Sequence, residues 1–272
     1  MTPTWDSAHY LSFADERTRP FVDLLARVDT RPGCIVDLGC GPGHLTALLH
    51  ARWPGAAVTG VDSSAEMIAR ARSDNAARPT GQVSYVHDDL RDWRAEQSVD
   101  LLVSAATLQW VPEHLSLLPE LTAAVAPGGA FALTVPANFD AASHRLLGEM
   151  ATHEPYAAHT AGAERPAAHD AATYLQALSG PGWRVDAWET TYLHLLQGSD
   201  PVLRWISGTG ARSVLQALPS DGSPGGPGDL RSRFELEYAA ALREAYPPGP
   251  YGTVLPFRRV FAVAHRSQAA SP

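Results

Sequence analysis

The chain has two cysteines, no lysine and no long apolar run, and each shortage excludes a class of protein. Cys34 and Cys40 cannot make a zinc site alone, and we expect both to pack as small apolar side chains. The 21 basic residues are all arginines that form no cluster, and the net charge of −8 argues against a dedicated nucleic-acid surface. Charges interrupt the apolar runs, which fall short of a membrane span.

Residues 1–6 carry neither a basic start nor an apolar core, so we expect no signal peptide and a cytoplasmic protein. The 272 residues are enough to bury the core of one α/β domain, with or without an insertion. No bound metal is expected.

Residues 36–46, Val-Asp-Leu-Gly-Cys-Gly-Pro-Gly-His-Leu-Thr, organise the rest of the sequence. The pattern predicts a buried strand over 34–38, a glycine-rich turn and a helix with a leucine face. Glycines 39, 41 and 43 let the backbone turn sharply and let a ligand approach the main chain. A turn of this kind after the first strand is the usual nucleotide site of an open α/β sheet.

The glycine spacing favours one nucleotide over another. A dinucleotide fingerprint is G-x-G-x-x-G, whereas this turn reads G-x-G-x-G, with His44 where the third glycine would stand. Asp37 would repel a pyrophosphate but suits a ligand with an ammonium and a sulfonium group. The stretch resembles motif I of the class I S-adenosylmethionine (SAM) methyltransferases. The alternative is a plain strand–turn–helix whose glycines serve tight packing.

A second acid, Asp62, follows the next predicted strand, 57–61. It lies about twenty residues beyond Gly39, where an acid accepts hydrogen bonds from both ribose hydroxyls. The alternative is a helix-entry acid favoured by the helix dipole. Ser63 to Glu66 forms a capping-box pattern, Ser-x-x-Glu, at the start of a helix that carries Met67.

A third acid follows the predicted strand 83–86. Asp89 stands before Leu90, and this pair suits an adenine ring, with the carboxylate accepting from the amino group and the leucine against the ring. Asp88 is the alternative acid. These positions place the third acid at the same sheet edge as the first two.

The fourth predicted strand, 99–104, ends in small residues. Ala105 and Ala106 would leave space beside the sulfonium. Gln109 and Trp110 follow and face cofactor or substrate, although Trp110 suits the core equally well.

A helix over 113–125, stopped by residues 127–129 (Pro-Gly-Gly), and a strand over 130–135 complete five strands that alternate with helices. Such alternation predicts a right-handed, parallel, doubly wound Rossmann-like α/β sheet. The glycine turn and the three acids each follow a successive strand and so converge at its carboxyl edge.

The second half departs from this alternation. We predict helices over 138–152, 171–178, 201–218 and 230–246, a loop over 153–168, and strands over 183–196 and 257–264. Helices that do not fit between adjacent strands are expected to cap the carboxyl edge. The expected organisation is a core with a lid helix over 1–138, a cap segment over 139–168, a return to the sheet over 169–198, a helical cap over 199–252, and a final strand and tail over 253–272.

An N-terminal arm and helix precede the first strand. Asp15 is expected to cap a helix with Phe21, Leu24 and Leu25 on its apolar side. This helix covers the sheet, or it forms a lid whose aromatics, Tyr10 among them, close over the cofactor.

Several stretches together resemble the bacterial trans-aconitate 2-methyltransferases almost from end to end. The resemblance is weak over 139–168 and at the Gly/Pro loop 220–228. The Tyr-x-His and Thr-Gly-x-Arg segments distinguish this family from other SAM methyltransferases. The shared stretches are Tyr10-Leu11-x-Phe13, Glu16-Arg17-x-Arg19-Pro20, 36–46, Arg52-Trp53-Pro54, 60–64, 108–112, Trp188-x-Thr190-Thr191-Tyr192-x-His194, Trp205-x-x-x-Thr209-Gly210-x-Arg212 and Arg259-x-Phe261-x-Val263-Ala264.

The resemblance implies an enzyme that methylates a carboxylate of a small tricarboxylic acid, giving a methyl ester and S-adenosylhomocysteine (SAH). A carboxylate is already ionised near neutral pH, so no general base is required. The expected substrate-positioning residues are Tyr192, His194, Arg212 and Arg259, with Gln109 and Trp110. Alternatively, Arg212 bridges cap helices, Arg259 pairs with an acid on the sheet, and His194 is a hydrogen-bonded structural residue.

The expected cofactor is SAM and the expected partner is a small carboxylic acid, with no nucleic acid and no membrane, in a monomer or small homo-oligomer. Rival functions are methylation of a natural-product carboxylate, hydroxyl or amine, a non-catalytic SAM-binding protein, and a nicotinamide-dependent oxidoreductase. The residues expected at the cofactor are Tyr10, Asp37, Gly39, Cys40, Gly41, Gly43, Asp62, Ser63, Met67, Asp89, Leu90, Ala105 and Ala106.

Overall fold

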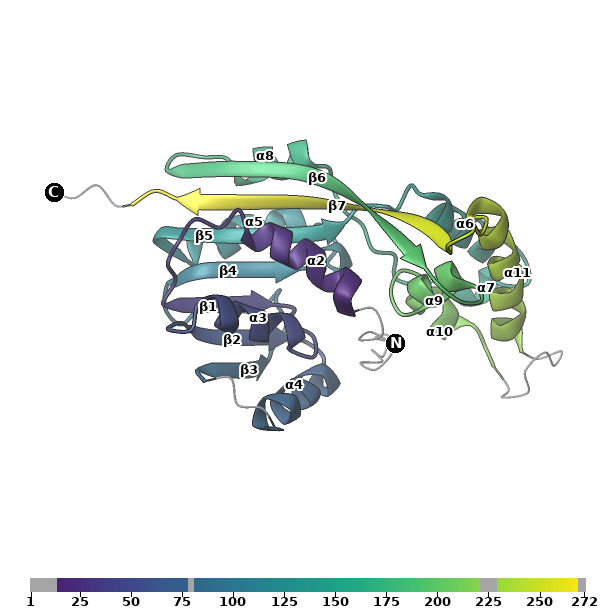
Figure 1. Cartoon of the computed structure of the whole chain (residues 1–272), viewed down its shortest axis with the longest axis horizontal. Coiled ribbons are helices and arrows are strands. Elements are labelled where there is room, and N and C mark those ends of the chain that lie inside the picture. Colours follow the sequence, from purple (N-terminus) through teal and green to yellow (C-terminus); the bar gives the residue numbers. More distant parts are fainter. Residues whose placement is uncertain (1–13, 78–80, 221–228, 269–272) are drawn as a thin grey trace. The chain divides into compact units, whose positions relative to one another are not determined.

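The computed structural model describes residues 14–77, 81–220 and 229–268 (Figure 1). The chain divides into two compact units. The sheet unit comprises Ala14–Pro136, Ala168–Thr190 and the residues from Arg259 onward, and the helical unit comprises Ala137–Ala167 and Thr191–Arg258. No helix in the described part of the chain is long and apolar enough to cross a membrane.

Seven strands of the described residues form one sheet in the order β3-β2-β1-β4-β5-β7-β6 (Figure 1). Strands β1 to β5 pair in parallel, whereas β7 runs antiparallel to β5. This confirms the predicted Rossmann-like class, to which the second half of the chain adds an antiparallel edge. The strands are β1 Cys34–Leu38, β2 Ala57–Asp62, β3 Val83–His87, β4 Val99–Ala105, β5 Val125–Pro136, β6 Trp183–Leu196 and β7 Thr253–Arg266.

The centre of the sheet is mainly apolar because strands inside a parallel sheet are covered on both faces. Strand β1 lies between β2 and β4, and Ile35, Leu38 and Leu101 are fully buried. Helices pack on neighbouring strands: α2 on β5, α3 on β2, α4 on β3 and α5 on β5. The helices of this unit are α2 Ala14–Leu25, α3 His44–Arg52, α4 Ala65–Ala77, the 3-10 turns η1 Leu108–Trp110 and η2 His114–Leu117, α5 Leu118–Ala123 and α8 Ala171–Leu178.

The helical unit has an apolar core of its own. Phe234 and Tyr238 are fully buried there, and the Tyr238 hydroxyl donates to the Ser143 carbonyl at 2.7 Å. The Ser143 amide in turn donates to the Tyr246 hydroxyl at 3.1 Å, so two tyrosines fix the first turn of α6. The helices of this unit are α6 Ala142–Ala151, α7 Ala157–Thr160, α9 Pro201–Ser207, α10 Arg212–Ala217 and α11 Leu230–Ala245.

Strand β5 begins earlier than predicted, and the preceding helix is shorter. Residues 127–129 do not end a helix but lie within β5, where the register with β4 shifts between the Val99–Val125 and Leu101–Ala130 pairs. Gly128 has φ +81°, which an irregularity of this kind accommodates easily. The predicted helix 113–125 is accordingly η2 followed by α5, and Val125 belongs to the strand.

The predicted helix 201–218 is interrupted. It consists of α9 and α10, separated by a turn in which the Thr209 and Ala211 amides both donate to the Ile206 carbonyl at 3.0 Å. A Cβ on Gly210 would lie 2.6 Å from His144 Nε2, so this turn packs directly on that ring. The contact between Gly210 and His144 therefore interrupts the helix, although the sequence pattern is helical throughout 201–218.

Other differences concern the ends of elements. The 138–152 helix is α6, the 153–168 loop contains α7, and the last strand extends to Thr253 and Arg266. Helix α2 begins at Ala14, so Asp15 lies within it rather than at its cap. Strand β6 and helix α8 have the predicted bounds.

We expect Tyr238→Phe to lower the free energy of unfolding by about 0.5–1.5 kcal/mol, because it removes a buried hydrogen bond to the Ser143 carbonyl. Tyr251→Phe is the matched control, since Tyr251 is 78% exposed and its loss should have no effect. Urea unfolding measures both. Equal stability of the two variants would contradict the role given to Tyr238.

Candidate active site

The glycine turn between β1 and α3 contains glycines with two different tasks. A Cβ on Gly39 would lie 2.0 Å from Thr107 Oγ1, and one on Gly43 would lie 2.5 Å from the Tyr85 hydroxyl. These two glycines are therefore required by packing. Gly41 also has a positive φ, +56°, but nothing lies within 4 Å of the Cβ position there. Gly41 is thus the glycine of the turn that leaves room for a ligand.

Asp37 is a buried carboxylate one residue before the end of β1. It is 2% exposed, and its Oδ2 accepts a hydrogen bond from Thr46 Oγ1 at 2.7 Å. Burial raises the pKa of Asp37 to about 7, and the nearby charge of Asp62 adds to the effect. A cation bound beside Asp37 would restore its ionised form.

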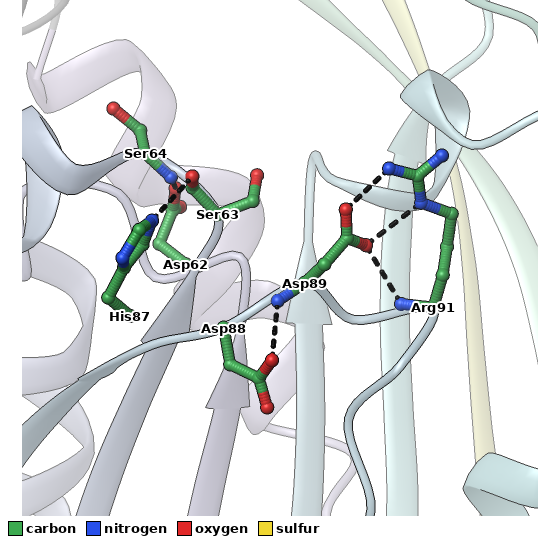
Figure 2. A network of polar contacts seen from close by, with 7 residues as sticks. All are labelled: Asp62, Ser63, Ser64, His87, Asp88, Asp89 and Arg91. Carbon is green, nitrogen blue, oxygen red and sulfur yellow. Dashed lines mark hydrogen bonds and ion pairs between the residues drawn. The ribbon is translucent and has the colours of Figure 1, made fainter.

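Asp62, at the end of β2, is held by the backbone. Its carboxylate accepts from the Gly41 amide at 2.9 Å, and burial raises its pKa. It also accepts from the Ser64 amide at 2.8 Å (Figure 2). A carboxylate oxygen has two lone pairs, so each oxygen retains capacity for a further donor. The same side chain therefore fixes the glycine turn and offers two acceptors.

The capping prediction is displaced by one residue. Helix α4 begins at Ala65, and the Met67 amide donates to the Ser64 hydroxyl at 3.3 Å, so Ser64 rather than Ser63 caps it. Ser63 is exposed, and its carbonyl lies 3.0 Å from His87 Nε2 (Figure 2). The Asp62–Ser64 hydrogen bond sets this register.

Asp89 already has a partner in this structure. Its carboxylate accepts from the Arg91 guanidinium at 2.9 and 2.5 Å and from the Arg91 amide at 3.0 Å (Figure 2). The Arg91 hydrogen bonds lower the pKa of Asp89. The Asp88 carboxylate accepts from the Asp89 amide at 2.9 Å, and Leu90 is half-buried. Asp89 is thus a firmly ionised acceptor.

The end of β4 is strained. Ala106 has φ +56°, a conformation that non-glycine residues adopt at a cost, and such strain collects at functional sites. Gln109 is 5% exposed, and its Nε2 donates to the Ala106 carbonyl at 2.6 Å. Thr107 Oγ1 donates to the Gly39 carbonyl at 3.3 Å, which joins this segment to the glycine turn. Trp110 is half-buried.

The remaining predicted cofactor residues have simple environments. Cys40 is 5% exposed, burial raises the pKa of its thiol, and it packs as an apolar side chain beside Gly60. Met67 is 3% exposed, and Ala105 is half-buried. Tyr10 lies outside the described residues.

Sequence reasoning missed three residues that shape this edge: Thr46, Tyr85 and Thr107. Thr46 and Tyr85 come from α3 and β3, and Thr107 follows β4. Each acts by contacting a residue of another element, and a single sequence carries no signal for such a pairing.

Four of the residues predicted to position the methyl acceptor are buried. Tyr192, His194 and Arg212 belong to the helical unit and are 2%, 7% and 6% exposed, whereas Arg259, also 6% exposed, belongs to the sheet unit. The His194 ring lies 4.6 Å from the Trp205 ring, centroid to centroid. Burial lowers the pKa of Arg212 to about 10.

The parallel sheet, the glycine turn and the buried acids at its carboxyl edge define a class I methyltransferase fold. Residues 35–129 match the family model described as a methyltransferase domain. Among solved structures, the YcgJ protein of Bacillus subtilis has a TM-score of 0.60 at 12% identity, covering 93% of this chain and all (100%) of that one. A putative methyltransferase of Haloferax volcanii has a TM-score of 0.56 at 19% identity, covering 96% and 94%. These likenesses concern the fold alone.

Curated relatives are much closer. The trans-aconitate 2-methyltransferase of Streptomyces avermitilis is 51% identical, with 97% of each chain covered. Its namesakes in Streptomyces coelicolor and Methylobacterium nodulans are 49% and 44% identical, covering 98% and 97% of this chain and 88% and 99% of theirs. The chain belongs to the trans-aconitate 2-methyltransferase family. It is a SAM-dependent methyltransferase, which confirms the predicted cofactor.

We expect Gly41→Ala to separate binding from folding. The methyl group meets no atom, so the variant should fold with a cost of about 1–2 kcal/mol for its positive φ, while SAH affinity falls at least tenfold. Gly39→Ala is the contrasting variant, because its methyl group collides with Thr107 and should destabilise the fold itself. Thermal unfolding and calorimetry distinguish the two. Unchanged SAH affinity in Gly41→Ala would show that no ligand approaches this glycine.

Proposed function

We propose that the protein transfers the methyl group of SAM to a carboxylate of trans-aconitate, giving the methyl ester and SAH. The observation that carries this proposal is the 51% identity, over 97% of both chains, to a relative named for the same acceptor. The site supports this proposal in two ways. The described residues fit SAM, the methyl donor, and the acceptor needs no general base because its ionised carboxylate is itself the nucleophile.

The residues of the sheet unit fit SAM. The backbone at Gly41 is open to a ligand, the Asp62 oxygens retain lone pairs for two ribose hydroxyls, and the buried Asp37 calls for a cation such as the ammonium group. Asp89 and Leu90 are assigned to the adenine, and Ala105 and Ala106 border the methyl group. When bound, SAM supplies a methyl group activated by a positively charged sulfur.

We assign the remaining cofactor residues by their position in the backbone and their packing. Gly39, Gly43 and Cys40 shape the turn, and the Ser63 and Met67 segment carries the first turn of α4. Tyr10 is retained as a lid residue on the sequence alone.

The acceptor needs positioning rather than activation. An ionised carboxylate is itself the nucleophile, so the chain must align its oxygen and exclude water. Arginine is the natural carboxylate clamp, and we assign Arg212 and Arg259 to this task. The assignment extends to the other buried polar side chains predicted from the sequence, namely Tyr192, His194, Gln109 and the half-buried Trp110.

We further propose a cytoplasmic location and no nucleic-acid partner. The net charge of −8 supports the latter, and the two cysteines, which are free thiols, are in keeping with a reducing compartment.

The pKa of Asp37 predicts a pH-dependent affinity for SAH. Since that pKa is about 7 in the ligand-free protein, the carboxyl is largely protonated at pH 6 and must release its proton before it can pair with an ammonium group. SAH affinity should therefore rise between about pH 5.5 and 7.5, and Asp37→Asn should abolish the rise. Calorimetry in buffers of different ionisation enthalpy counts the released protons. An affinity that is flat over this range in the wild type would contradict the pairing.

The acceptor is tested with labelled SAM and a panel of mono-, di- and tricarboxylates, alcohols and amines, followed by mass spectrometry. We expect trans-aconitate to be methylated as a carboxylate ester. Arg212→Met should raise its KM at least tenfold, because charge is lost and bulk is kept, while SAH affinity stays within twofold; Arg204→Met, at an exposed position on α9, is the control. Methylation of an alcohol or amine but of no polycarboxylate would refute the proposed function.

A further inference from the structure

A buried amide after β5 has an unsatisfied polar atom. Asn138 is 4% exposed, and within the described structure its Oδ1 is buried without a hydrogen-bond partner. Its Nδ2 lies 3.4 Å from His144 Nδ1. An unpaired buried polar atom costs about 1–3 kcal/mol, and a bound ligand that pairs with the atom offsets this cost.

His144 holds this amide in place. Its ring stands edge-on to Phe139 at 5.2 Å, Ser143 Oγ lies 3.3 Å from Nδ1, and Gly210 packs on Nε2. Burial lowers the pKa of His144 to about 4, so the ring is neutral at neutral pH. The neutral His144 ring is held by its contacts with Phe139 and Gly210, and it therefore fixes the position of the Asn138 amide.

The orientation of the amide decides whether Asn138 presents an unpaired hydrogen-bond acceptor or unpaired donors. Oxygen and nitrogen are nearly identical in shape, so the same positions are occupied after a half-turn of the amide. With a proton on Nδ1, His144 donates to the Asn138 oxygen, and the amide nitrogen becomes the group without a partner. That nitrogen has two N–H donors, which suit an anion.

The surroundings also favour an anion. The turn that packs on His144 leads directly to Arg212, a buried cation assigned to the acceptor. Asn138 and His144 belong to the same unit as that turn. A neutral double donor and a guanidinium are both groups that recognise carboxylate oxygens.

We propose that Asn138 is a carboxylate-binding residue, whose amide nitrogen donates to a carboxylate of the acceptor that is not methylated, and that His144 is its positioning residue. This inference rests on the proposed function. It adds a site for a second carboxylate and so predicts a preference for polycarboxylates over monocarboxylates.

The decisive variant is Asn138→Asp, which keeps the shape and adds a negative charge. We expect the KM for trans-aconitate to rise at least tenfold and SAH affinity to stay within twofold. The KM for an unsaturated monocarboxylate should be unchanged, because that acceptor has no second carboxylate to repel. Asn75→Asp, on α4 of the sheet unit, is the matched control and should leave the KM for trans-aconitate unchanged.

His144→Leu tests the positioning role. It should raise the KM for trans-aconitate with little change in kcat and none in SAH affinity, a split that general destabilisation would not produce. If Asn138→Asp fails to fold, Asn138→Ser removes the donors at lower cost and should show the same selective loss.

Two results would overturn the inference: an unchanged KM for trans-aconitate in the folded Asn138 variant, or an equal rise for mono- and tricarboxylates. Failure of the proposed function looks different, because the wild type would then methylate no polycarboxylate and trans-aconitate would show no calorimetric binding in the presence of SAH.

Discussion

The described site depends on negative charge that is buried at the carboxyl edge of a parallel sheet. Asp37 and Asp62 lie in a desolvated environment, and the charge of Asp62 helps raise the pKa of Asp37 to about 7. Placing carboxylates there costs folding free energy unless donors or a cation compensate. The fold supplies donors in part, through the Thr46 hydroxyl and the amides of Gly41 and Ser64. A ligand with an ammonium group and ribose hydroxyls would supply the cation and the remaining hydrogen-bond donors. We therefore propose that the acids whose burial costs folding free energy are the residues that select SAM.

This constraint explains the shape of the surrounding backbone. Asp62 binds the Gly41 amide and thereby holds the turn open at the glycine that has space beside it. Thr107 packs on Gly39 from the segment after β4, and the strained Ala106 precedes it. Strain at that position is retained because neighbouring contacts fix it, as expected for a segment that borders a reacting group.

The sequence was sufficient for the sheet but not for contacts between elements. Alternating strands and helices, and the glycine turn after β1, follow from local patterns and were predicted correctly. Val125, the 127–129 segment and the 208–211 turn were predicted wrongly, because strand register and the packing of Gly210 on His144 override a local helical pattern. The positions of the acids at the strand ends likewise follow from local patterns, whereas the contacts of Thr46, Thr107 and the Asn138–His144 pair do not. These contacts form only when segments that are distant in the sequence pack together.

A crystal structure of the complex with SAH would show whether the acids at the sheet edge hold the cofactor. We expect both ribose hydroxyls within hydrogen-bond distance of the Asp62 carboxylate, the ammonium group beside Asp37, and the ligand passing over Gly41. A nucleotide bound elsewhere, with Asp62 still bonded only to the amides of Gly41 and Ser64, would contradict this expectation.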